Sequence, residues 1–169
     1  MQRGKVRSRS DLTEQPWIKP PPGMIKCNVD AASFNGNSIM GYDMCFRDST
    51  SLFLLGKSDY FATSTTVLEV ESLGLLEAIK VAISNDMQDV MFETDSKVLS
   101  DALHTTSTLA NEFGDLVSHC RSLLVSRNDF FVSCVRRQAN KVIAHSIARA
   151  SLSTLAPIFF VMYRLLCTL

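Results

Sequence analysis

The spacing of apolar residues changes along this chain from a period of two to a period near 3.6, and this change constrains the fold most. Apolar and polar residues alternate from Met24 to Asp30, as in a strand with one buried face. The segments Ile39–Arg47 and Leu52–Ala62 are also strand-like, and short runs of turn residues separate the three segments. Three strands joined by short turns predict an antiparallel meander.

After the third segment the pattern becomes helical. Thr65 or Thr66 is suited to cap a helix from Val67 to about Asn85, because a Glu follows three or more residues later. The apolar run Asp89–Thr94 lies between two helical segments, which favours a central, parallel strand. We further expect helices over 96–104, 111–126 and 140–153, and a last strand over 130–136. This order predicts a mixed-sheet α/β domain.

Three carboxylates stand where a soluble domain usually has neutral residues. Asp30 closes the first strand-like run, and Asp95 follows the apolar run of the fourth. Glu71 lies within the apolar arc of the first helix, whereas Glu69 lies near its polar edge and Glu77 faces away. Such carboxylates are costly unless they are paired or metal-bound, so a fold that gathers them makes an all-oxygen site suited to Mg²⁺ or Mn²⁺. Each alone also fits a plainer role, such as a turn residue or a helix cap.

Composition narrows the class of protein. The 169 residues are 46% hydrophobic, which predicts a packed globular domain. Lys+Arg and Asp+Glu are 17 each, so no overall basic charge indicates a nucleic-acid partner. Basic clusters near both ends of the chain are suited either to phosphate contacts or to a solvated surface. The five cysteines contain no C-x-x-C pair, which argues against a zinc site.

The chain divides into three segments by composition. Residues 1–16 are basic and expected to be disordered, residues 17–153 form the domain, and residues 154–169 form an apolar tail. The uninterrupted apolar part of this tail is too short to predict a membrane span, so we expect no membrane partner. The N-terminus lacks an apolar secretory signal, and we expect an intracellular monomer in the nucleus or cytoplasm.

Five blocks of residues occur in an order that resembles plant reverse-transcriptase-like ribonuclease H domains. Those domains begin with W-x-x-P-P-x-G-x-x-K-x-N-V-D-G-A, which the run from Trp17 to Ala32 resembles. The other blocks are Gly41–Asp48 (G-x-G-x-x-x-R-D), Glu71–Ala78 (E-x-x-A-L-x-x-A), Phe92–Ser96 (E-x-D-S) and Arg136–Arg149 (R-x-x-N-x-x-A-H-x-L-A-R). Each block is weak alone, but together they cover most of the chain, which therefore resembles type-1 ribonuclease H domains.

The resemblance implies a five-stranded mixed sheet flanked by helices and cleavage of the RNA strand of RNA–DNA hybrids. Asp30, Glu71 and Asp95 match the family's metal-binding acids, and His145 stands at the position of a fourth acid. The implied chemistry is a two-metal displacement with Mg²⁺ or Mn²⁺. His145 fits a satisfied helix histidine as well as a ligand.

Contacts with nucleic acid are expected from three further residues: Asn28, Arg136 and Asn140. Arg136 fits a solvated surface equally well, and Asn140 is also suited to cap the last helix.

Two residues depart from the family pattern. Ala31 replaces a glycine, which would strain the chain if that position had a positive φ. Asp43 replaces a small residue and is expected on the solvent-facing side of its strand, with a metal ligand as the alternative. These departures, with His145, support a second hypothesis: a weak or inactive ribonuclease H-like module, derived from a retrotransposon, that binds nucleic acid or a partner.

Overall fold

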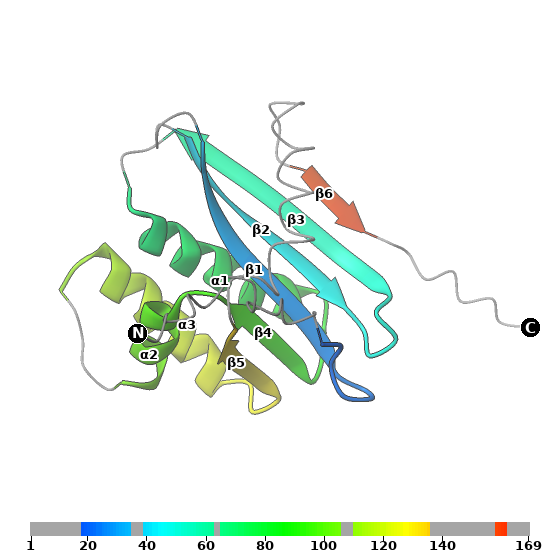
Figure 1. Cartoon of the computed structure of the whole chain (residues 1–169). Helices are drawn as coiled ribbons and strands as arrows, with labels where there is room; N and C mark the ends of the chain where they lie inside the picture. The colour runs from blue at the N-terminus through cyan, green and yellow to red at the C-terminus, as the bar shows by residue number, and fades with distance from the viewer. Residues whose placement is uncertain (1–17, 35–38, 63–64, 106–109, 136–157, 162–169) are drawn as a thin grey trace, which may run out of the picture.

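A single mixed sheet forms the centre of the molecule. The computed structural model describes residues 18–34, 39–62, 65–105, 110–135 and 158–161 (Figure 1). The strands are β1 (Ile25–Phe34), β2 (Ile39–Arg47), β3 (Phe53–Ala62), β4 (Val90–Thr94), β5 (Phe130–Cys134) and β6 (Ile158–Val161). Their spatial order is β5-β4-β1-β2-β3-β6. Strands β1, β2 and β3 are antiparallel, and β4 is parallel to both β1 and β5.

The five predicted strands are confirmed, with two differences. Strand β1 continues to Phe34, so Asp30 lies inside this strand and does not close it. Strand β6 was not expected within the apolar tail, and it pairs antiparallel with Leu55–Ser58 of β3. The tail is apolar without a clear alternation, so its pattern alone does not separate a strand from other buried structure.

Three helices lie on one side of the sheet: α1 (Val67–Ser84), α2 (Lys97–His104) and α3 (Glu112–Val125) (Figure 1). Thr66 begins α1 with a capping box, in which Glu69 N donates to Thr66 Oγ1 and Thr66 N donates to Glu69 Oε2 at 2.7 Å. Ser96 and Asn111 cap α2 and α3. These helices are therefore confirmed, while the helix expected over 140–153 lies outside the described residues.

The apolar core lies between the sheet and α1. Phe92 is fully buried, and its ring makes edge contacts with those of Phe46 and Phe130 at centroid distances of 6.4 and 5.4 Å. Gly74 allows α1 to approach the sheet closely. A Cβ there would lie 2.8 Å from Tyr42 Cβ and 3.1 Å from Val29 Cγ1. We call this side of the sheet the helical face.

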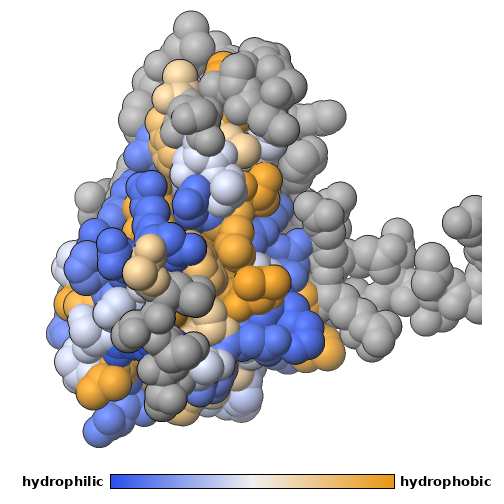
Figure 2. Space-filling view, turned by 90° about the vertical axis from the view of Figure 1, so that its left-hand side faces the viewer, coloured by the Kyte–Doolittle hydropathy of each residue, from blue (hydrophilic) through white to orange (hydrophobic). Residues whose placement is uncertain are grey.

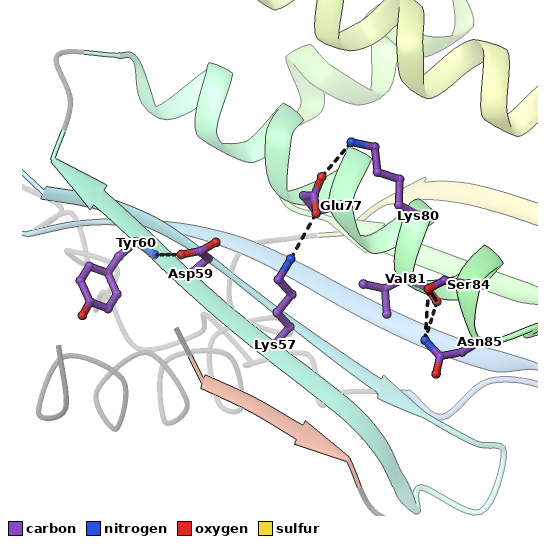
Figure 3. Close-up of polar contacts among 8 residues, drawn as sticks. All are labelled: Lys57, Asp59, Tyr60, Glu77, Lys80, Val81, Ser84 and Asn85. Atoms are coloured by element: carbon purple, nitrogen blue, oxygen red, sulfur yellow. Dashed lines mark hydrogen bonds and ion pairs between the residues drawn. The ribbon is translucent and has the colours of Figure 1, made fainter. Parts of the chain in front are cut away.

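Glu77 differs from its expected position. Its place in the helical period predicts a side chain that faces away, but that side chain is 23% exposed, and its carboxylate is 3.1 Å from Lys57 Nζ of β3 (Figure 3). Lys80 lies on the next turn of α1, and its Nζ is 2.9 Å from Oε1 of the same carboxylate. Glu77 therefore links the helix to the sheet on the helical face.

The surface mixes hydrophobic and hydrophilic residues on the face drawn in Figure 2. Among the described residues, the most exposed large hydrophobic side chains are Val125 at 81% and Ile18 at 72%. Within the same part of the chain, none of the helices has the length and apolar character needed to cross a membrane.

Candidate functional site

The parallel pairing of β1 with β4 sets the level of two of the predicted acids. The paired residues run from Ile25 with Val90 to Asn28 with Glu93, so each β4 partner is numbered 65 higher. The same offset, continued by two residues, puts Asp30 level with Asp95. Both residues are half-buried. Strand β4 ends at Thr94 while β1 continues, so the two acids lie where this pairing stops.

Glu71 comes from α1 and belongs to the helix side that meets the sheet. It precedes Gly74 by three residues, so the two share a side of the helix. Gly74 lies against Val29, the neighbour of Asp30 in β1. Glu71 is itself half-buried. The close approach at Gly74 therefore positions the helix that carries the third predicted acid.

The Cys134 thiol lies within electrostatic range of both Glu71 and Asp95. Cys134 ends β5 and pairs with Thr94, the residue before Asp95. Burial raises the pKa of the Cys134 thiol; the carboxylates of Asp95 and Glu71 raise it further, while Lys97 opposes them. Both acids therefore act electrostatically on the same thiol.

Asp43 faces Asp30 across the β1–β2 pair, and its expected solvent-facing position is wrong. It is only 3% exposed, and its carboxylate accepts a short hydrogen bond from Ser58 Oγ of β3. Burial raises the pKa of Asp43 to about 7, and the negative charge of Asp30 adds to this rise. The alternation of side chains along β2 places Asp43 on the face of the sheet opposite the helices. We call this the polar face, and it is buried at Asp43.

A buried ion pair lies next to Asp30 and Asp95 on the polar face. Glu93 Oε1 lies 2.6 Å from Lys26 Nζ, and Glu93 Oε2 accepts from Asn28 Nδ2 at 2.9 Å. Asn28 is 2% exposed, and its predicted contact with nucleic acid stays a prediction. Lys26 and Glu93 were not among the residues predicted from the sequence. Their alternation with Asp30 and Asp95 was the available signal, since residues two apart on a strand share a face.

The donor chemistry of the predicted trio fits a hard divalent ion. Asp30, Glu71 and Asp95 offer only carboxylate oxygens, which Mg²⁺ and Mn²⁺ prefer. Within the described ranges, however, no three His, Cys, Asp or Glu side chains are grouped closely enough to hold a metal ion.

Three predicted site residues belong to a part of the chain that the structure does not describe. His145, Arg136 and Asn140 lie outside the described residues. The non-glycine residues with positive φ in the described part are Ser51, Asp86 and Asp89, so Ala31 continues β1 without this strain.

Comparisons with known proteins agree with this architecture. A family model described as "Reverse transcriptase-like" matches residues 28–151. No curated protein matched the chain in a sequence search. The structure resembles RNase H1 from the archaeon Halobacterium salinarum, with a TM-score of 0.67 and 19% identity over 78% of this chain and 99% of that chain.

Two further solved structures are similar to this chain. The N-terminal RNase H domain of a Mycobacterium tuberculosis protein has a TM-score of 0.63 and 17% identity over 79% of this chain and 99% of that chain. LC11-RNase H1, isolated from compost by a metagenomic approach and solved in complex with an RNA/DNA hybrid, has a TM-score of 0.64 and 16% identity over 78% and 98% of the two chains. These likenesses confirm the expected ribonuclease H fold.

Proposed function

Because the chain belongs to the reverse transcriptase-like family, we propose that it is a metal-dependent endonuclease that hydrolyses the RNA strand of RNA–DNA hybrids. The observation that carries the proposal is the parallel register of β1 and β4, which, extended two residues beyond its last pair, puts Asp95, the residue after β4, level with Asp30 in β1. The hybrid bound to one structural neighbour supports the choice of substrate.

In this proposal the three acids divide the work by their place in the fold. Asp30 and Asp95 hold divalent ions from rigid positions in and after strands, and Glu71 contributes a carboxylate from α1. Bound Mg²⁺ or Mn²⁺ supplies Lewis acidity at the scissile phosphate and lowers the pKa of an attacking water. Glu71 is also suited to accept a hydrogen bond from a 2′-hydroxyl, the group that distinguishes RNA from DNA.

The first test is cleavage of a labelled RNA–DNA hybrid in Mg²⁺ or Mn²⁺. We expect cleavage that stops when EDTA removes the metal. Asp30→Asn and Asp95→Asn each remove a ligand charge, and we expect each to lower the rate about 100-fold or more. Asp101→Asn is the matched control, because Asp101 is an exposed acid on α2 whose ion pair with Lys97 lies at the surface. Equal rates in wild type and Asp95→Asn would refute the proposal.

A second candidate is a ribonuclease H-like module that binds nucleic acid with little or no cleavage. Asp43 favours it, because a buried carboxyl stands directly opposite Asp30 where the resembled family has a small residue. Calorimetric titration with Mn²⁺ and a fluorescent hybrid separates the two. Hybrid binding without Mn²⁺ binding or cleavage supports the module, whereas Mn²⁺ binding that Asp95→Asn abolishes supports the enzyme.

A further inference from the structure

Lys26, Asn28 and Glu93 form a buried polar network between β1 and β4, which we call the register network. All three are at most 6% exposed. Lys26 and Asn28 engage different oxygens of the Glu93 carboxylate, at 2.6 and 2.9 Å. Lys26 Nζ also donates to the carbonyl oxygen of Ile18 at 2.5 Å, in the segment that leads into β1. Buried charges are tolerated only when such partners surround them, so the network favours the relative position of the two strands in which these partners meet.

Apolar packing on the helical face does not by itself fix the register of β4 on β1. Ile25 and Cys27 lie opposite Val90 and Phe92 on that face. Side chains alternate with a period of two, so a slip of one residue would turn the apolar residues to the wrong face. A slip of two residues would keep every apolar residue on the helical face. The apolar pattern therefore discriminates weakly between registers that differ by two residues.

The register network discriminates between those registers by charge. If β4 moved two residues so that Glu93 came level with Asp30, two carboxylates would meet and Lys26 would lose its close partner. Like charges directly opposite each other are destabilising. The opposite movement would bring Glu93 level with Lys26 and Asp95 level with Asn28, so Asn28 would exchange Glu93 for Asp95 and Asp95 would leave the level of Asp30. In the observed register one carboxylate, that of Glu93, binds both Lys26 and Asn28.

We infer that Glu93, bound by Lys26 and Asn28, is a positioning residue that fixes the register of β4 on β1 and thereby holds Asp95 level with Asp30. The consequence for the site rests on the proposed function. A slip of two residues would move one acid along the strand by about 6.6 Å. Metal–oxygen bonds are only about 2.1 Å long for Mg²⁺, so acids displaced by that distance no longer share an ion.

The test compares two ion pairs on opposite faces of the sheet. Glu93→Gln breaks the charge pairing of the register network, and Glu77→Gln breaks the Lys57–Glu77 pair on the helical face (Figure 3). We expect calorimetry to show at least tenfold weaker Mn²⁺ binding for Glu93→Gln. For Glu77→Gln we expect a change of less than about twofold, since its pair lies on the other face. Equal Mn²⁺ affinity in folded Glu93→Gln and wild type would overturn the inference.

A variant without buried charge separates positioning from stability. The triple variant Lys26→Met, Asn28→Leu, Glu93→Leu replaces the network with apolar residues, and such replacements often preserve or raise stability. We expect it to fold and still bind Mn²⁺ at least tenfold more weakly, because apolar residues discriminate weakly between registers that differ by two residues. If the stable, folded triple variant bound Mn²⁺ as tightly as the wild type, the register network would have only a structural role, and the inference would be overturned.

Amide hydrogen exchange tests the register without any metal. We expect at least tenfold faster exchange over residues 90–94 in Glu93→Gln than in Glu77→Gln, with the free energy of unfolding matched by added urea. Equal exchange in these two variants would overturn the inference whatever the metal result. If the two variants show this exchange difference but the wild type binds no Mn²⁺, the proposed function is refuted while the register claim stays supported.

Discussion

The two faces of the sheet are both buried, but they are built from different chemistry. The helical face carries apolar residues such as Val29, Met44 and Phe92, and α1 packs on it. The polar face buries a set of hydrogen-bonding and charged residues: Lys26, Asn28, Asp43, Arg47, Ser58 and Glu93. Apolar packing is non-directional, whereas buried polar groups require particular partners. The helical face therefore supplies stability, and the polar face selects the arrangement in which Asp30 and Asp95 stand level.

The largest effect is expected from a cavity on the helical face. Phe92→Ala removes a fully buried ring that touches Phe46 and Phe130, and we expect a loss of about 3–5 kcal/mol in the free energy of unfolding. Urea denaturation followed by circular dichroism measures the loss. A loss below about 1 kcal/mol would contradict the assignment of stability to this face.

The variant Asp43→Asn tests whether the buried carboxyl on the polar face lowers the free energy of unfolding. Its folded pKa of about 7 lies above the ordinary value of 3.8, so the folded state keeps its proton where the unfolded chain has lost it. The wild type should therefore lose stability from this group as the pH rises from about 4 to 7. We expect Asp43→Asn, compared with wild type in EDTA, to gain roughly 2–4 kcal/mol more at pH 8 than at pH 4.

Urea denaturation of Asp43→Asn and wild type at both pH values measures this difference. The asparagine keeps an oxygen that can accept from Ser58, so the change isolates the charge. An equal difference between the two proteins at pH 4 and pH 8 would show that Asp43 does not titrate as described.

Gly74 tests how closely the helical face must pack. In Gly74→Ala the new Cβ would lie 2.8 Å from Tyr42 Cβ, so helix and sheet must separate. We expect a loss of about 1–3 kcal/mol despite the better helix propensity of alanine, and weaker Mn²⁺ binding because Glu71 moves with α1. Lys80→Ala, at an exposed position of the same helix, is the control. If Gly74→Ala were more stable than the wild type, α1 and the sheet could separate without a loss in the free energy of unfolding.

The smallest effect is expected at Glu77, a charged residue on the helical face. Burial raises the pKa of Glu77, but hydrogen bonds from Lys80 and Lys57 outweigh it, and the net pKa is lowered. The stability from this pair is present above the unfolded value of 4.5 and is lost as the pH falls. After solvent screening, we expect Glu77→Gln to cost less than about 1 kcal/mol at pH 7.

This pH dependence is opposite in sign to that of Asp43 on the polar face. Unfolding of Glu77→Gln and wild type at pH 7 and pH 3 measures it. A larger cost at pH 3 than at pH 7 would contradict the sign.

The sequence predicts elements better than it predicts burial. Periodicity and caps located α1 and its first residue, since Thr66 and Glu69 form a local motif that needs no tertiary context. Alternation also places Asp43 on the same face as Arg47, but it does not state whether that face is covered. Asp43 was therefore expected in solvent, although it is buried. The partners of Glu93 depend on strand register, which pairs residues 65 apart in the chain and is not visible in any local sequence pattern.

Strand β6 has a consequence for the edge of the sheet. Its four residues cover the backbone of β3 from Leu55 to Ser58, while the family match ends at residue 151. A chain shortened to the matched segment would leave these N–H and C=O groups of β3 exposed as an open edge. Strand β6 is itself the outer strand, so the sheet ends in a four-residue strand, and its loss would leave the ten-residue β3 as the edge. Long open edges invite other strands to join them, so we expect the shortened chain to aggregate more readily.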